Sequence, residues 1–148
     1  MSTVVLDDHL LRDVLSGGRS RDLGGIATGL ATTGLWLFRL CSSFAEPHVL
    51  GKLSAPIASL PSELQEQFRS QLMALPDDID VLHMRDLAWP MGQLQHRHRA
   101  QGHRLSAAMV EALAVAHELG ADLAVSHLDV GPNLRAAAND DGILFHIL

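Results

Sequence analysis

Cysteine is nearly absent from this sequence, and so are long apolar runs. Cys41 is the single cysteine among 148 residues, so no disulfide can form within the chain, which is typical of a reducing cytoplasm, and we expect a cytoplasmic location. The longest apolar stretch runs from Leu35 past Leu40, is interrupted by Arg39, and is too short to cross a membrane. The N-terminus lacks a basic segment followed by an apolar one, so we predict no signal peptide and no membrane partner.

Basic residues are in deficit as well. Lys and Arg number 11 against 17 Asp and Glu, and the formal net charge is −6. This balance excludes a generally basic, nucleic-acid-binding surface but is compatible with a local basic patch. Hydrophobic residues make up 47% of the chain, which is typical of a folded protein, and the length predicts one domain over residues 1–148.

Short apolar segments alternate along the chain with segments of helical spacing. The expected strands are 3–6, 30–32, 79–84, 123–126 and 143–147, and the expected helices are 8–15, 33–45, 61–75, 86–101, 106–119 and 130–138. Residues 19–27 weakly favour a short helix, and residues 46–60 favour a loop or a broken helix. Because the strands are short, apolar and without hairpin signals, we expect an α/β fold with a central parallel sheet covered by helices on both faces.

Two carboxylates, Asp7 and Asp8, lie where the first expected strand meets the first expected helix. Helix chemistry offers one explanation, because aspartate is a good N-cap and its charge suits the positive end of the helix dipole. A metal or catalytic site offers another, because ligands bind beyond the carboxyl ends of strands in open parallel sheets. Asp8 fits the capping role as well as Asp7 does, so both interpretations stay open.

Three stretches of the chain resemble the PIN-domain family of α/β nucleases, many of which are toxins of bacterial toxin–antitoxin pairs. VVLDDHLLRDVL is similar to the opening strand of the family, whose first metal-binding aspartate falls on Asp7, and LATTGLWLFRLC is similar to its second strand and helix. LSAAMVEALAVAHELGADLAVSHLDVGPNLRAAANDDGILFHIL is similar to the final helix–strand–helix–strand. The order of these elements covers nearly the whole chain and implies a PIN-like three-layer α/β/α sandwich.

The resemblance also implies a cluster of carboxylates around Mg²⁺ or Mn²⁺, which activate a water and stabilise charge during phosphodiester cleavage. The implied catalytic residues are Asp7, Glu111 and Asp129, and the implied metal ligands are Asp7, Asp8 and Asp129. Two of them have simpler alternatives. Glu111 is also explained as an ordinary helix residue, and Asp129 as a cap for the helix that follows it.

This sequence departs from the family pattern at three acidic positions. The glutamate of the family falls near Arg39, and its third acid falls on Met109. Glu111 lies two residues further on, about 200° around a helix, so it replaces that acid only if the helix register differs. The fourth acid falls near His127, with Asp129 close by. Asp7, at the first acidic position, is therefore the one carboxylate that clearly matches the family pattern.

Arg39 and Thr33 each have two interpretations. As a functional residue Arg39 binds phosphate, and as a structural one it fills the position of the lost metal ligand and neutralises Asp7, which we favour. Thr33 either directs its hydroxyl into the cleft as a nucleic-acid contact or serves as an N-cap. Trp36 and Phe38, on the same expected helix, are predicted to be core residues.

The stretch HRHRAQGHR, residues 96–104, concentrates positive charge in an acidic chain. Its histidines are His96, His98 and His103, and its arginines are Arg97, Arg99 and Arg104. A solvated helix end is the favoured interpretation, because cations suit a helix C-terminus. A transition-metal site is disfavoured, because the histidine spacing matches no zinc pattern. The intermediate interpretation is a local patch whose arginines contact the phosphates of RNA.

Two functions of different class follow from the resemblance. The first is a Mg²⁺- or Mn²⁺-dependent ribonuclease of toxin type, which acts on RNA and has an antitoxin as its protein partner. The second is a PIN-like domain that has lost catalysis and acts as a binding or dimerisation module, as a homodimer or with another protein. The departures at positions 39 and 109 favour the second function, and the general activity of the family favours the first.

Overall fold

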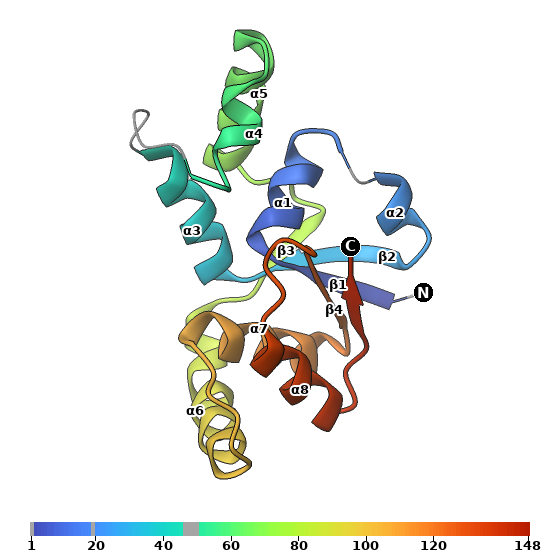
Figure 1. The fold of residues 1–148 in the computed structure, drawn as a ribbon, viewed down its shortest axis with the longest axis vertical. Helices are drawn as coiled ribbons and strands as arrows, with labels where there is room; N and C mark the ends of the chain where they lie inside the picture. The colour runs from blue at the N-terminus through green and yellow to red at the C-terminus, as the bar shows by residue number, and fades with distance from the viewer. Residues whose placement is uncertain (1, 19, 46–50) are drawn as a thin grey trace.

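A computed structural model describes residues 2–18, 20–45 and 51–148, in which eight helices surround one five-stranded sheet (Figure 1). The strands are β1 (Ser2–Leu6), β2 (Ala27–Thr32), β3 (Ile79–Val81), β4 (Asp122–Val125) and β5 (Phe145–Ile147). The helices are α1 (Asp8–Leu15), α2 (Ser20–Gly24), α3 (Gly34–Ala45), α4 (Ala55–Ala58), α5 (Ser62–Met73), α6 (Met84–Ala100), α7 (Ala107–Leu119) and α8 (Pro132–Asp140). The predicted alternation of strands and helices is therefore confirmed.

The sheet is parallel throughout, in the order β3-β2-β1-β4-β5. In Figure 1, α1 to α5 lie on one side of the sheet, and α6 to α8 lie on the other. The fold is thus the predicted three-layer α/β/α sandwich. The part of the expected loop at residues 46–50 lies outside the described residues.

The central strand β1 explains why the first apolar run has no polar alternation. Val4 and Leu6 are fully buried in a cluster with Leu10 of α1, whereas Val5 is fully buried in another cluster that includes Leu113 of α7. Successive side chains of a strand point to opposite faces, and helices cover both faces here. Both faces of β1 are therefore buried, which explains why Val4, Val5 and Leu6 are all apolar.

Capping chemistry sets several helix ends where the sequence predicts them. The Asp7 carboxylate caps α1 by accepting a hydrogen bond from the Leu10 N–H at 2.9 Å. The Ser106 hydroxyl caps α7, and Gly120 ends that helix with a left-handed φ of 57°. Glycine adopts this conformation without steric penalty, so the predicted boundary is confirmed. No helix among the described residues is long and apolar enough to span a membrane.

Several boundaries differ from those predicted, and the largest differences lie in β2, β3 and α6. β2 begins at Ala27 rather than at residue 30, because its small residues pair with β1 through registers such as Thr3↔Gly29. Small residues carry little strand propensity, and tertiary pairing overrides it here. β3 ends at Val81, and α6 already begins at Met84. α6 continues past Pro90, which removes only one backbone donor from the helix.

The strand order creates a topological switch between β1 and β4. The chain builds β1, β2 and β3 outward in one direction, then returns to place β4 on the other side of β1. The loops that leave the two neighbouring strands therefore diverge at the carboxyl edge of the sheet. Ligand crevices of open α/β sheets form at such a point.

Candidate functional site

A small cavity of about 140 Å³ lies at this switch point, and we call it the strand-edge cavity. Its lining includes Asp7 after β1, Trp36 and Arg39 of α3, Met109 of α7 and Asp129 after β4. The sequence placed several candidate residues at this edge of the sheet. The structure brings Asp7, Arg39 and Asp129 to one cavity.

Asp7 forms the buried wall of the strand-edge cavity, with 3% of its surface exposed. Its Oδ1 accepts a hydrogen bond from the Leu10 N–H, and its Oδ2 accepts one from the Ser126 N–H, both at 2.9 Å. Burial raises the pKa of Asp7 to about 7, because desolvation outweighs these two donors. Both carboxylate oxygens thus hold the start of α1 against the end of β4, which is a structural role.

Asp8 is 1% exposed, and its two carboxylate oxygens differ in their hydrogen bonds. Its Oδ1 accepts a hydrogen bond from the His9 N–H at 2.9 Å, but no hydrogen bond from a described residue reaches the buried Oδ2. Burial raises the pKa of Asp8, and the nearby Arg39 opposes that rise. A buried carboxylate oxygen that accepts no hydrogen bond is rare, and the charge of this one is balanced by an ion pair with Arg39.

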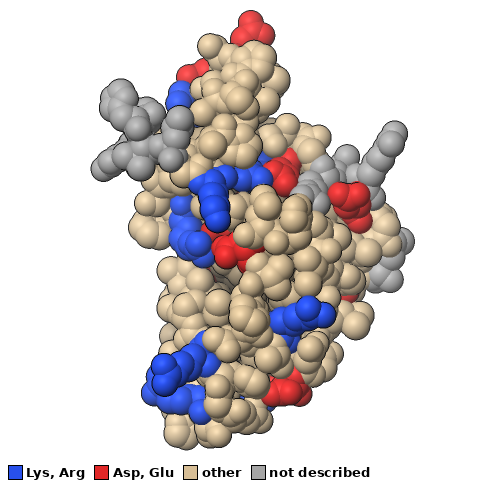
Figure 2. All heavy atoms as spheres, in the orientation of Figure 1, with Lys and Arg blue, Asp and Glu red and all other residues tan. Residues whose placement is uncertain are grey.

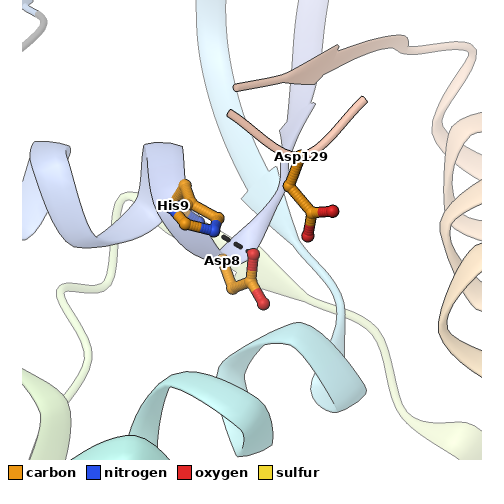
Figure 3. A group of neighbouring side chains, drawn as sticks. All are labelled: Asp8, His9 and Asp129. Carbon is orange, nitrogen blue, oxygen red and sulfur yellow. Dashed lines mark hydrogen bonds between the residues drawn. The ribbon is translucent and has the colours of Figure 1, made fainter. Parts of the chain in front are cut away.

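One group of side chains in the described part of the chain is close enough to share a cation. Asp8, His9 and Asp129 each offer one ligand atom, and these atoms lie within 4.8 Å of one another. Figure 3 shows Asp8 and His9 on the first turn of α1, with Asp129 on the segment that follows β4. We call this the Asp8–His9–Asp129 group.

His9 is the member of this group that sequence reasoning missed. It is buried, with 4% of its surface exposed, and burial lowers the pKa of its imidazole. A neutral imidazole is the form that binds metal ions. The available signal was its position directly after two acids, in the first turn of a helix that leaves the central strand.

Glu111 and Asp7 do not belong to that group. Glu111 is 1% exposed, and its Oε1 accepts a hydrogen bond from the Leu35 N–H at 2.8 Å. A negative charge at this end of α3 also suits the helix dipole. Glu111 therefore anchors the start of α3 to α7, and the implied catalytic set of Asp7, Glu111 and Asp129 is not assembled around one ion.

Arg39 bridges the two acids of the group. Its Nε lies 3.3 Å from Asp8 Oδ2, and its Nη2 lies 3.9 Å from Asp129 Oδ2. The prediction that Arg39 neutralises Asp7 is wrong, because its ion-pair partners are Asp8 and Asp129. The Arg39 side chain is half exposed, so it can leave this position without opening the core.

Other positions near the cavity correct the sequence analysis. Thr33 is fully buried, and its Oγ1 accepts a hydrogen bond from the Trp36 N–H at 3.0 Å. The N-cap interpretation of Thr33 is confirmed, and a nucleic-acid contact is wrong. Trp36 is buried as predicted, but Phe38 is 66% exposed, because it lies about 200° around α3 from Trp36. Asp129 does not cap α8, whose N-cap is Gly131.

The histidine- and arginine-rich stretch contacts a buried carboxylate, Asp141, which the sequence alone does not single out. Asp141, at the end of α8, accepts hydrogen bonds from Arg97 at 2.6 and 3.2 Å and from the Nε2 atoms of His98 and His117 at 2.9 Å each. Burial raises the pKa of Asp141, but the bonds from Arg97, His117 and His98 outweigh it, and the pKa falls well below the usual range. Asp141 thus joins the ends of α6, α7 and α8.

This carboxylate changes the interpretation of the stretch. His98 is fully buried, so a solvated helix end is wrong for it, whereas His103 is partly exposed and contacts Asp140 through its Nε2 at 2.5 Å. Arg97 forms an ion pair with Asp141 through its Nη1 at 2.6 Å, so its charge is already balanced by a carboxylate. Arg99 and Arg104 are exposed, and neither has an ion-pair partner among the described residues.

Comparisons with known proteins add no identification. No protein-family model matches the chain, and no curated protein matches its sequence.

Proposed function

We propose that the protein is a PIN-like ribonuclease that uses Mg²⁺ or Mn²⁺ bound by the Asp8–His9–Asp129 group. The observation that carries the proposal is Asp8 Oδ2, a buried carboxylate oxygen that accepts no hydrogen bond from a described residue and whose charge is balanced by an ion pair with the half-exposed Arg39 at 3.3 Å. It lies at the topological switch point, where α/β sheets bind their ligands. Two carboxylates and a neutral imidazole form a donor set that suits a divalent cation.

Each residue then has a distinct part in RNA cleavage. Asp8 and Asp129 supply the anionic oxygens, and His9 supplies a nitrogen. A bound cation neutralises charge on the phosphodiester and lowers the pKa of a water. Arg39, displaced from the two acids, retains its charge at the mouth of the strand-edge cavity and pairs with the RNA phosphate. Asp7 holds the α1 and β4 segments that carry these groups.

The donor set predicts a preference between the two ions. Mg²⁺ strongly prefers oxygen ligands, whereas an imidazole is a better ligand for transition-metal ions. Mn²⁺ should therefore bind more tightly than Mg²⁺, and His9→Ala should reduce that difference. The same variant leaves both carboxylates in place, so Mg²⁺ affinity should change less than Mn²⁺ affinity.

Calorimetric titration with Mn²⁺ and Mg²⁺ tests the proposal. The wild type should bind Mn²⁺ with micromolar affinity, and Asp8→Asn should lose that binding. Asp77→Asn, at an exposed aspartate between α5 and β3, is the matched control and should bind as the wild type does. Cleavage of a single-stranded RNA should require Mn²⁺ or Mg²⁺ and disappear in Asp8→Asn. No binding by the wild type at millimolar metal would refute the proposal.

The ion pair of Arg39 with Asp8 favours a second function, a catalytically degenerate module that binds a protein or dimerises. In that case Arg39 permanently replaces the cation, and Met109 fills the position of a lost acid in the strand-edge cavity. Phe38, 66% exposed beside Arg39, would lie in the interface with a second copy or an antitoxin-like partner. Sedimentation equilibrium of the wild type and Phe38→Ser tests this, because a dimer that dissociates only in the variant supports it.

A further inference from the structure

The outward face of α6 carries an unusual stripe of side chains. Helical periodicity places five residues within about 40° of one line along this helix, on the side opposite the core residues Leu87 and Leu94. These five, which we call the α6 stripe, are Arg85, Trp89, Gly92, His96 and Arg99, and all are exposed. The stripe holds cations and one large aromatic side chain but no acid.

Charge is segregated around this stripe. Residues 84–104 contain four arginines and one aspartate, a net charge of +3, whereas the whole chain carries −6. One of these arginines, Arg97, is balanced by Asp141. Arg85 and Arg99 have no ion-pair partner in the described ranges, so their charges remain available to a ligand. Figure 2 shows basic side chains gathered at the lower left of this face, in the region of α6. A local positive surface on an acidic protein is complementary to a polyanion and not to the rest of this chain.

Trp89 adds a second, independent feature. Its side chain is 76% exposed, although tryptophan is among the residues that a fold buries most readily. No part of the described fold covers it, while Trp36, the other tryptophan, is 4% exposed. Exposed aromatic rings between basic residues are the stacking platforms of proteins that bind single-stranded nucleic acids.

Gly92 lies one turn beyond Trp89 on the same line. A Cβ at Gly92 would meet no heavy atom within 4 Å, and its φ is not in the left-handed region. Folding therefore does not require glycine here, and alanine would favour the helix more. A glycine on an exposed helix face leaves the backbone open to close approach by a ligand.

The position of α6 links the stripe to the candidate site. β3 ends at Val81, and α6 begins at Met84, so the Arg85 end of the stripe lies at the carboxyl edge of the parallel sheet. The strand-edge cavity opens at the same edge, two strands away at β1. From Arg85 to Arg99 the stripe extends about 21 Å along the helix.

We propose that the α6 stripe binds single-stranded RNA, with phosphates at Arg85 and Arg99 and a base stacked on Trp89 beside Gly92. This inference deepens the proposed ribonuclease function, on which the choice of RNA rests, by assigning a surface to the substrate strand. It requires no residue of the Asp8–His9–Asp129 group. Binding can therefore be measured in EDTA, where no cation is present and no cleavage occurs.

Fluorescence anisotropy of a labelled 12-nucleotide oligouridylate in EDTA at 50 mM salt tests the proposal. Trp89→Ala should weaken binding about tenfold, as expected for the loss of one stacked base. The double variant Arg85→Gln/Arg99→Gln should reduce the slope of log affinity against log salt by about 1.4, for two lost phosphate contacts. Arg69→Gln and Met73→Ala are matched controls, because both residues are exposed on α5, across the sheet from α6, and should bind as the wild type does.

Two further variants separate binding from stability. RNA should quench the exposed tryptophan, and Trp89→Phe should abolish the quenching while it preserves most of the affinity. Gly92→Gln should raise the melting temperature, because glutamine favours the helix, and should weaken RNA binding several-fold by covering the open backbone. A residue with a purely structural role would not produce opposite changes in these two measurements.

Several results would overturn the proposal. They are no anisotropy change at tens of micromolar protein, equal losses in the α5 controls, or equal affinity for duplex RNA. A self-association that Trp89→Ala removes, without any RNA binding, would instead assign the stripe to a second copy of the chain. Asp8→Asn should retain RNA binding in EDTA, so failure of the cation site and failure of the stripe give different results.

Discussion

The Arg39 guanidinium lies 3.3 Å from the Asp8 carboxylate and reaches the Asp129 carboxylate at 3.9 Å, so one side chain neutralises the two acids of the candidate metal group. A cation that enters this group has to displace Arg39 or share the acids with it. The half-exposed position of Arg39 moderates this competition, because solvent screens its charge.

Arg39→Ala should therefore tighten Mn²⁺ binding by about tenfold, which corresponds to roughly 1.4 kcal/mol, within the range for unit charges about 4 Å apart near a surface. Calorimetry in the same buffer as the wild type measures the change. Arg69→Ala removes a similarly exposed arginine on α5 and should leave the affinity unchanged. Unaltered or weaker Mn²⁺ binding in Arg39→Ala would show that Arg39 does not compete with a cation.

Glu111→Ala should lower the free energy of unfolding by about 3 kcal/mol, because it empties a buried site and removes the hydrogen bond to the Leu35 N–H. Glu111→Gln retains an acceptor oxygen and should lower it by only about 1 kcal/mol. Urea denaturation measures both changes. Mn²⁺ affinity should stay within twofold of the wild type in Glu111→Gln. Complete loss of metal binding in that variant would restore the catalytic assignment that the resemblance implies.

The sequence predicts the layers of this fold well, because the apolar periodicity and the end signals of most elements agree. The strand β1, the cap at Ser106 and the glycine at Gly120 are recognisable from neighbouring residues alone. β2 is less visible, because Ala27 and Gly29 acquire strand structure through pairing with β1. Local chemistry therefore explains where the helices end, and long-range pairing determines the bounds of strands such as β2.

The candidate site is less predictable, because it depends on partners far apart in the chain. The position of Asp7 can be predicted from the end of a strand. The sequence does not show, however, that the Ser126 N–H donates a hydrogen bond to its Oδ2. Glu111 is likewise committed to Leu35, 76 residues away. The same limit hides the contacts of Arg97 and His98 with Asp141, which lies more than 40 residues from both.

Asp141→Asn should lower the free energy of unfolding at pH 7 by about 3 kcal/mol, because it leaves the donors of Arg97, His98 and His117 without their shared carboxylate. Thermal or urea unfolding measures the loss. Asp140→Asn is the matched control, since Asp140 is half exposed and pairs with His103 alone among described residues. It should change stability by less than about 1 kcal/mol. Equal effects of the two variants would contradict a special role for Asp141.

The difference in the free energy of unfolding between the wild type and Asp141→Asn should depend on pH, because the pKa of Asp141 is lowered. A carboxylate with a depressed folded-state pKa contributes its full stabilisation above the unfolded value of 3.8, and the contribution falls as the pH drops toward the folded value. The gap between the wild type and Asp141→Asn should thus be constant from pH 5 to 7 and shrink below about pH 4. A gap that persists unchanged at pH 3 would show that the carboxylate charge does not cause it.

Asp7 should give the metal-free protein the opposite pH dependence. Its pKa is raised from 3.8 to about 7, so between these values the folded protein holds a proton that the unfolded chain has released. The stabilisation is full below the unfolded pKa and is lost as the pH rises through the folded pKa. For a shift of about three pKa units, the free energy of unfolding changes by roughly 4 kcal/mol. Burial raises the pKa of Asp8 as well, so Asp8 adds a loss of the same sign.

Urea unfolding in EDTA from pH 5 to 8 measures this slope. The wild type should lose stability across the range, and Asp7→Asn, which keeps an acceptor for the Leu10 N–H, should lose much less. Asp77→Asn serves as the control at an exposed site and should retain the wild-type slope. If Asp7→Asn instead showed the full wild-type slope, Asp7 would ionise normally in the folded protein. Its contacts with Leu10 and Ser126 would then outweigh its burial.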